Sequence, residues 1–133
     1  MTSKEHIIYL ILNLAKKFNN QREKSFRQLL EETNYFKIQH QIKEKDILET
    51  VNKYPEVLLS WMQWSANKRV TSGWFLIEEN GEYIVSYYPH SEANQTLKTR
   101  DGHKACAYFI LKEIDGLKEV VGSKKLLKKS YEQ

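Results

Sequence analysis

The sequence predicts an α+β fold: an N-terminal bundle of about four helices, one antiparallel β-hairpin and a C-terminal helix. Three observations predict this class. Apolar residues recur at helical spacing in the first half of the chain and again near its end. Between these parts the apolar period changes to two, which is typical of strands. The dipeptide Asn80-Gly81 then marks a two-residue turn in the middle of the alternating segment.

The first expected helix runs from about Lys4 to Phe18 without a break. Thr2 and Glu5 have the spacing of a capping box, in which a hydroxyl and a carboxylate satisfy backbone amides at a helix start. Apolar residues cover much of the circumference of this helix, so we expect it to lie deep in the core.

A second capping box, Ser25 with Gln28, predicts a helix that ends near Thr33-Asn34. Residues 35–41 do not favour one state, and their aromatic and aliphatic side chains suggest a packed connection.

Two more helices are expected before the hairpin. One runs from about Lys43 to Lys53 and ends before Pro55, because proline disfavours helix at the residue that precedes it. The same proline suits the first position of the next helix, which carries two of the three tryptophans and frays around Ala66-Asn67.

Around Asn80-Gly81, a two-residue loop pairs Glu79 with Glu82 and fixes every other partner along the strands. Both faces of the resulting hairpin are partly apolar, and two like charges opposite each other are unfavourable. A three-residue loop with a glycine bulge would relieve that contact and shift the register, so both turns stay open. The expected cross-strand pairs on the two faces are Gly73–Tyr88, Phe75–Ser86 and Ile77–Ile84, and Trp74–Tyr87, Leu76–Val85 and Glu78–Tyr83.

After the hairpin we expect a polar loop with a short third strand around residues 96–99, and then a helix capped by Asp101. Cys106 lies on the apolar stripe of that helix. The domain is expected to span residues 1–121, and residues 122–133 form a lysine-rich tail.

Composition limits the class of protein. A chain of 133 residues with 41% hydrophobic and 29% charged residues fits one globular domain. One cysteine permits no internal disulfide, so a reducing cytoplasm is the expected compartment, and the apolar run near the N-terminus is too short to cross a membrane. The net charge is +4, and four lysines against one glutamate in the tail supply most of it.

No motif predicts catalysis, a metal or a cofactor, so we expect no enzyme. The four histidines have no helical metal-site spacing, and the five glycines are too far apart for a phosphate loop. His103 lies three residues before Cys106, but a cysteine on an apolar stripe is a buried hydrophobe far more often than a nucleophile. Glu78 beside Ile77 and Tyr83 is the one carboxylate in a partly apolar context, and glutamates at a hairpin tip are usually solvated.

Aromatic residues are concentrated in and before the hairpin. Some must be core, but tryptophan and tyrosine beyond the needs of a core are enriched at protein interfaces. In sites for single-stranded nucleic acid such residues alternate with lysine and arginine, whereas here they alternate with glutamate. The pattern therefore favours a cationic protein partner over a nucleic acid.

Short motifs in residues 45–115 resemble a group of small bacterial proteins. They are Asp46-Ile47-Leu48, Tyr54-Pro55-Glu56, Trp61, Ser65-Ala66-Asn67-Lys68-Arg69, Ser72-Gly73-Trp74-Phe75, Tyr83-Ile84-Val85, Ala105-Cys106-Ala107-Tyr108-Phe109-Ile110 and Glu113. The chain is similar in these motifs to immunity proteins of polymorphic-toxin and contact-dependent growth inhibition systems. The resemblance implies neutralisation of a cognate toxin domain by direct binding, and no catalytic residue comes with it.

The resemblance and the charge do not fully agree. Immunity proteins against nucleases are often acidic, and this chain is basic, so either the toxin is not a basic nuclease or the contact is local. The alternative function is a small RNA- or DNA-binding protein that uses the lysine-rich tail. The candidate partner-binding residues are Lys68, Arg69, Trp74, Glu78, Glu79, Glu82, Tyr83 and Tyr87.

Overall fold

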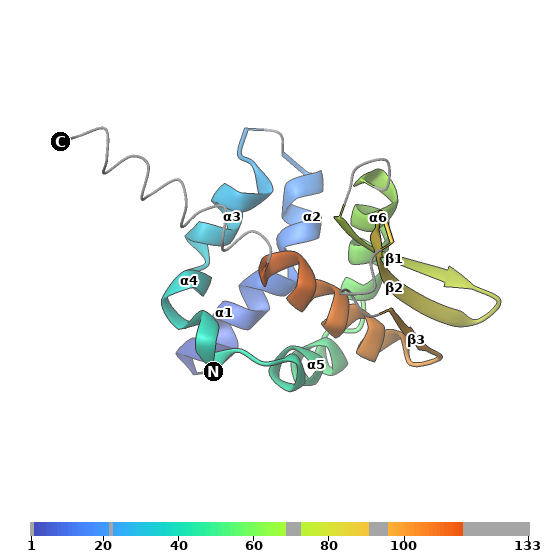
Figure 1. Cartoon of the computed structure of the whole chain (residues 1–133). Coiled ribbons are helices and arrows are strands. Elements are labelled where there is room, and N and C mark those ends of the chain that lie inside the picture. The colour runs from blue at the N-terminus through green and yellow to red at the C-terminus, as the bar shows by residue number, and fades with distance from the viewer. Residues whose placement is uncertain (1, 22, 69–72, 91–95, 116–133) are drawn as a thin grey trace.

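The computed structural model describes residues 2–21, 23–68, 73–90 and 96–115, and it confirms the α+β class. Short helices form most of the body, and a three-stranded antiparallel sheet lies at one side with its hairpin extending beyond the helices (Figure 1). The helices before the sheet are α1 (Ser3–Leu12), α2 (Leu14–Asn19), α3 (Phe26–Glu32), α4 (Tyr35–Ile38), the 3₁₀ turn η1 (Gln39–Gln41), α5 (Glu44–Lys53) and α6 (Val57–Lys68). The strands are β1 (Gly73–Glu79), β2 (Glu82–Tyr88) and β3 (Leu97–Thr99), and a C-terminal helix covers residues 102–115.

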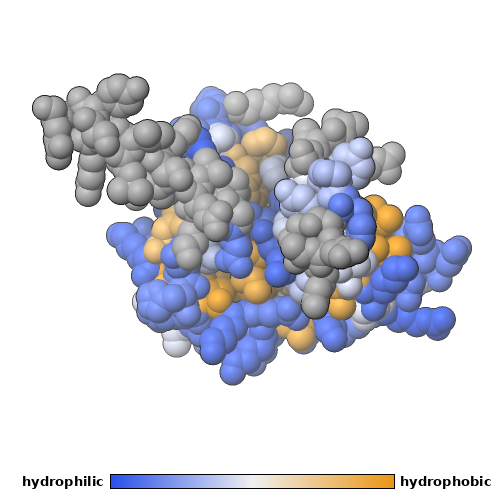
Figure 2. Space-filling model, viewed as in Figure 1, coloured by the Kyte–Doolittle hydropathy of each residue, from blue (hydrophilic) through white to orange (hydrophobic). Residues whose placement is uncertain are grey.

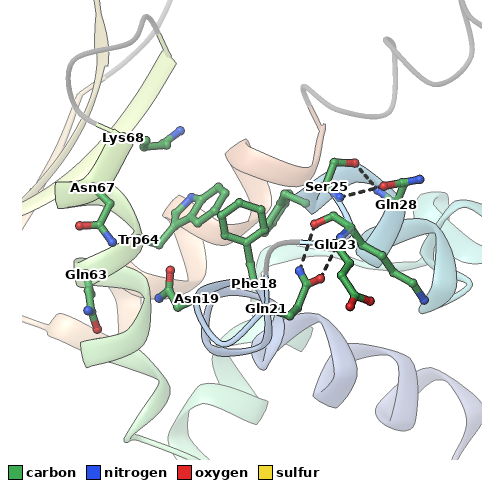
Figure 3. A pocket seen from close by; sticks show the side chains of 12 residues that line it. Phe18, Asn19, Gln21, Glu23, Ser25, Gln28, Gln63, Trp64, Asn67 and Lys68 are labelled. Carbon is green, nitrogen blue, oxygen red and sulfur yellow. Dashed lines mark hydrogen bonds between the residues drawn. The ribbon is translucent and has the colours of Figure 1, made fainter.

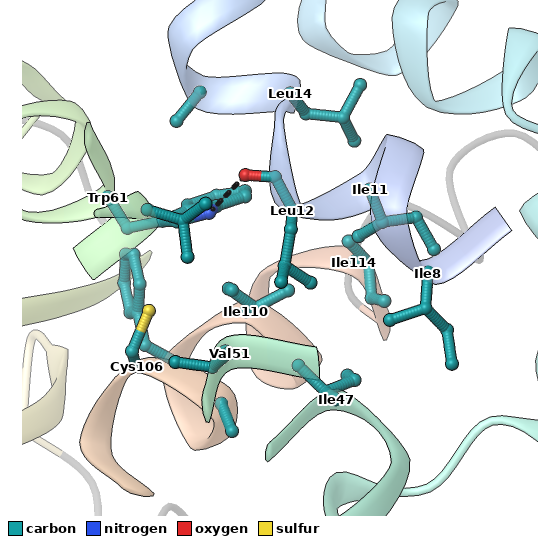
Figure 4. Packing of buried hydrophobic residues seen from close by; sticks show 14 of the residues in the cluster. Ile8, Ile11, Leu12, Leu14, Ile47, Val51, Trp61, Cys106, Ile110 and Ile114 are labelled. Atoms are coloured by element: carbon teal, nitrogen blue, oxygen red, sulfur yellow. Dashed lines mark hydrogen bonds between the residues drawn. The ribbon is translucent and has the colours of Figure 1, made fainter. Parts of the chain in front are cut away.

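The prediction of one continuous helix from Lys4 to Phe18 is wrong, because the chain breaks at Asn13 into α1 and α2. The Asn13 side-chain amide donates to the Tyr9 carbonyl at 2.9 Å, which is the oxygen that the Asn13 backbone amide would use in a continuous helix. That backbone amide bonds to Leu10 instead, at 3.2 Å. The break sits beside the core, and the Leu12 carbonyl there accepts a hydrogen bond from the buried Trp61 indole at 3.0 Å (Figure 4).

The predicted helix caps are present. The Thr2 hydroxyl accepts from the Glu5 amide at 3.1 Å, which is one half of the capping box expected there, and Ser25 forms a complete capping box with Gln28. The Asp101 carboxylate accepts from the amide of His103 at 3.1 Å, at the start of the C-terminal helix. The helix expected to begin at Pro55 begins at Val57, because the Val57 amide bonds three residues back to Tyr54 in a tighter turn.

The hairpin has the simple two-residue turn, not the bulged alternative. Asn80 and Gly81 both have positive φ, 54° and 79°, and every predicted cross-strand pair is present, from Gly73–Tyr88 to Glu79–Glu82. The short third strand β3 also exists and pairs antiparallel with β2.

The buried hydrophobic side chains form one cluster that draws on the helices and on both hairpin strands. Its centre holds Ile11, Ile47, Trp61 and Ile110, all fully buried (Figure 4). Strands β1 and β2 each contribute one buried apolar residue, Leu76 and Val85 respectively, so the sheet is attached to the core by a narrow apolar strip. The lysine-rich tail, residues 122–133, and the end of the expected domain at residue 121 lie outside the described residues.

Candidate protein-binding surface of the hairpin

The face of the hairpin that carries the aromatic candidates packs against the C-terminal helix. Trp74 meets Tyr108 of that helix edge to face, with ring centroids 6.1 Å apart, and meets its cross-strand partner Tyr87 at 5.5 Å. The Lys112 ammonium lies 5.4 Å from the Trp74 ring centroid, a cation–π contact. Trp74 is therefore part of the attachment of the sheet to the body.

Tyr83 belongs to the same packed face. A Cβ atom added to Gly102 would lie 2.9 Å from the Tyr83 ring, so the ring rests directly on the backbone at the start of the C-terminal helix. At its outer end the Tyr83 hydroxyl bonds to the Glu78 carboxylate, which raises the pKa of Tyr83 above its ordinary value. The ring of Tyr83 is structural, and its hydroxyl holds one of the three glutamates at the tip.

Helix α6 covers the outer edge of β1. The Leu76 backbone amide points away from β2 and donates to the Ser65 hydroxyl at 2.7 Å, and both residues are buried. An exposed strand edge pairs readily with other chains, and this bond closes the edge near the body.

The opposite face of the hairpin carries Phe75, Ile77 and Ile84. All three are half-buried, and none belongs to the core cluster or to the side chains packed on it. Ser86, the cross-strand partner of Phe75, bonds instead to Thr96 at 2.8 Å. The core thus leaves these three apolar side chains unused, and we call these three residues the outer face.

The tip of the hairpin is acidic. Glu78 and Glu79 are exposed and Glu82 is half-buried, on a turn that projects from the body (Figure 1). In Figure 2 the end of the hairpin is hydrophilic, and hydrophobic atoms come to the surface nearer the body. Lys98 on β3 and the exposed Arg100 beyond it lie on the other edge of β2, so the negative charge is concentrated at the turn and on the β1 side.

Lys68 lies apart from the tip, at the end of α6. Its ammonium forms an ion pair with Glu113 at 2.6 Å, and the Trp64 indole donates to the other carboxylate oxygen at 3.1 Å. The Glu113 side chain is only 9% exposed, so Lys68 neutralises a charge that is nearly buried. Lys68 is therefore a structural residue here, and Arg69 lies outside the described residues.

Cys106 is fully buried, and burial raises the pKa of its thiol to about 12. His103 does not act on it: the His103 Nδ1 atom lies 2.8 Å from the side-chain oxygen of Asn52 on α5. Among the described residues no group of three or more His, Cys, Asp or Glu side chains is placed to hold a metal ion.

No family model, curated protein or solved structure matches this chain. No helix in the described ranges is both long enough and apolar enough to cross a membrane.

Proposed function

We propose that this chain is a small binding protein that acts without catalysis, and that it neutralises a cognate toxin domain by direct contact in the bacterial cytoplasm. The observation that carries the proposal is the projecting hairpin, with Glu78, Glu79 and Glu82 at its turn and the outer face behind them. A finger with a charged end and an apolar side is suited to entering a cleft of another protein.

The glutamates supply steering and orientation. Charges at the rim of an interface raise the association rate and fix the register of the complex, and they add little affinity by themselves. A carboxylate cluster of this kind complements a cationic cleft, such as the one that a nuclease uses for phosphates. The net basic charge of the chain does not oppose such a contact, because salt largely screens solvent-exposed charges that lie more than about 10 Å away.

The outer face supplies the affinity. Phe75, Ile77 and Ile84 are half-exposed apolar side chains on neighbouring strands, and removing their remaining surface from water is favourable at roughly 25 cal/mol per Å². The packed face contributes nothing to the contact directly, because Trp74 and Tyr83 lie against the C-terminal helix. We therefore assign binding to the tip and the outer face, and attachment to the aromatic face.

The test uses the protein domain encoded immediately upstream of this chain, purified as a catalytically inactive variant. We expect tight binding by calorimetry, and protection of cells that express the active domain. Changing Glu78, Glu79 and Glu82 together to Gln should slow association by roughly tenfold at low salt and flatten its salt dependence.

The matched control changes three exposed glutamates outside the hairpin, Glu31 and Glu49 on helices and Glu56 just before α6, to Gln. It alters the net charge by the same amount and should leave the association rate nearly unchanged. An upstream domain that neither binds nor is neutralised, or equal slowing by both triple variants, would contradict the proposal.

A further inference from the structure

A second surface, made of residues outside the hairpin, has the character of a binding site. It is a groove of about 1080 Å³ between α6 on one side and the α2–α3 segment on the other (Figure 3). The sequence gives no motif for it, because its residues come from helices that only the fold brings together.

Three aromatic rings form the floor of the groove: Phe18, Phe26 and Trp64. Phe26 stacks on Trp64 with centroids 4.5 Å apart, and Phe18 meets Trp64 edge to face at 5.1 Å. Phe26 thus occupies one face of the indole, and Phe18 occupies part of its surroundings. The Lys68 ammonium also lies 6.0 Å from the Trp64 ring centroid. A planar base needs an open ring face for stacking, so this floor suits a small aliphatic side chain better.

The walls offer amide groups that nothing in the described part of the chain uses. Gln63 and Asn67 lie one turn apart on α6, and Asn19 ends α2; all three are exposed and make no side-chain hydrogen bond within the described residues (Figure 3). Two other amides of the groove are already engaged: Gln21 bonds to the backbone of Lys24, and Gln28 completes the α3 capping box. A side-chain amide offers both a donor and an acceptor, which matches a peptide backbone.

The lysines of the lining are paired within the described residues. Lys24 forms an ion pair with Glu32, and Lys68 forms one with Glu113. Binding of nucleic acid depends on cations that neutralise phosphates, and here both ammonium groups already face carboxylates.

From these contacts we propose that the groove binds an extended, uncharged peptide segment of a partner protein. The segment lies along α6, where the Gln63 and Asn67 amides bond to its backbone, and it places an aliphatic or proline side chain on the aromatic floor. The site is independent of the hairpin, so it stands even if the hairpin has no toxin partner.

A phage-displayed library of random ten-residue peptides is selected for binding to the immobilised full chain. The chain with Gln63→Ala and Asn67→Ala is used for counter-selection. Enriched peptides are then synthesised and titrated into the isotopically labelled full chain. We expect peptides rich in aliphatic residues and proline, with chemical-shift changes at the Gln63 and Asn67 side chains and at the Trp64 indole. The double variant should bind the peptides about tenfold more weakly, since two peptide-type hydrogen bonds are lost.

Both substituted positions are exposed and alanine favours helix, so the variant should remain folded. The matched control, Gln41→Ala with Asn52→Ala, removes the same two residue types outside the groove and should keep full affinity. Failure to enrich peptides over the counter-selected chain, or shifts that map to the hairpin, would overturn the proposal. So would a Trp64 response to a thymidine ten-mer or to cellohexaose with none to any selected peptide.

Discussion

The two faces of the hairpin have the same backbone and similar apolar content, yet they are used differently. On one face Leu76 and Val85 are buried, with Trp74 and Tyr83 packed beside them on the helices. On the other face, Phe75, Ile77 and Ile84 keep part of their surface in water. Hydrophobicity alone does not distinguish these faces, and the larger aromatic side chains lie on the face that is already occupied.

The difference shows how an aromatic-rich strand can mislead a search for an interface. Tryptophan and tyrosine are common at interfaces because they bring large apolar area with a polar atom, and the same property makes them useful for attaching a small sheet to a helix. A two-stranded hairpin is marginal alone, so its best packing residues are needed for its own stability. The apolar side chains that this packing leaves partly exposed include Phe75, Ile77 and Ile84.

The largest expected effect separates the faces by stability. Leu76→Ala should lower the free energy of unfolding by about 3 kcal/mol, since it leaves a cavity in the core, whereas Ile77→Ala on the outer face should cost less than about 1 kcal/mol. Urea unfolding followed by circular dichroism measures both.

The reactivity of the Cys106 thiol is a second measure of the difference between the Leu76→Ala and Ile77→Ala variants. Because the thiol is fully buried, modification requires opening of the structure, and Leu76→Ala should accelerate it far more than Ile77→Ala. Equal effects of the two variants would mean that the faces are energetically alike.

Trp74→Ala should lower the free energy of unfolding by about 2 kcal/mol, because it removes the contacts with Tyr108, Tyr87 and Lys112. Below its unfolding transition, the variant should bind the proposed partner, the domain encoded immediately upstream, with nearly wild-type affinity. Calorimetry at 10 °C, where the variant is folded, checks this. A stable variant that no longer binds would place Trp74 in the interface.

Gly102→Ala tests the close approach of Tyr83 to the C-terminal helix. The added Cβ would lie 2.9 Å from the Tyr83 ring and 3.0 Å from Leu58, so one of the two side chains must shift. We expect a loss of about 1 kcal/mol in thermal unfolding. The double variant with Tyr83→Ala should lose less than the two single changes combined, and strict additivity would argue against the contact.

The smallest expected effect is a gain in stability. Glu79 and Glu82 face each other across the turn, and like charges in that position are unfavourable. Glu79→Lys should therefore stabilise the fold by roughly 0.5 kcal/mol while it weakens binding to the toxin domain. Thermal unfolding and calorimetry on one preparation measure the stability of the fold and the affinity for the partner. If both rise in the variant, the repulsion between Glu79 and Glu82 is unrelated to the proposed function.

Local sequence signals predicted much of this fold. Asn80-Gly81 located the turn and left two registers open, of which the two-residue loop is the one observed. The helix starts followed from Ser25 with Gln28 and from Asp101, because caps depend on a few adjacent residues. The break at Asn13 was missed, since a side-chain bond to the preceding turn leaves the apolar pattern unchanged. The sequence does not decide the secondary structure of α4, because its four residues are too few to show a helical period.

The candidate site was harder to predict. Sequence reasoning placed Glu78 and Glu79 at an exposed tip, where the structure has them, but it could not decide which face of the hairpin meets the helices. That choice depends on contacts between Trp74 and Tyr108, which are 34 positions apart in the chain. Lys68 belongs to one of the motifs that carry the resemblance, and its partner Glu113 lies 45 positions further along the chain. The groove depends on three separate helices and has no sequence signature.

The central claim is that the outer face binds the partner while the aromatic face holds the sheet. Calorimetry with the domain encoded immediately upstream, the proposed partner, compares the affinity of the wild type with that of the double variant Ile77→Ser with Ile84→Ser. We expect this double variant to unfold within about 1.5 kcal/mol of the wild type and to bind roughly a hundredfold more weakly. Wild-type affinity in a folded double variant would contradict it.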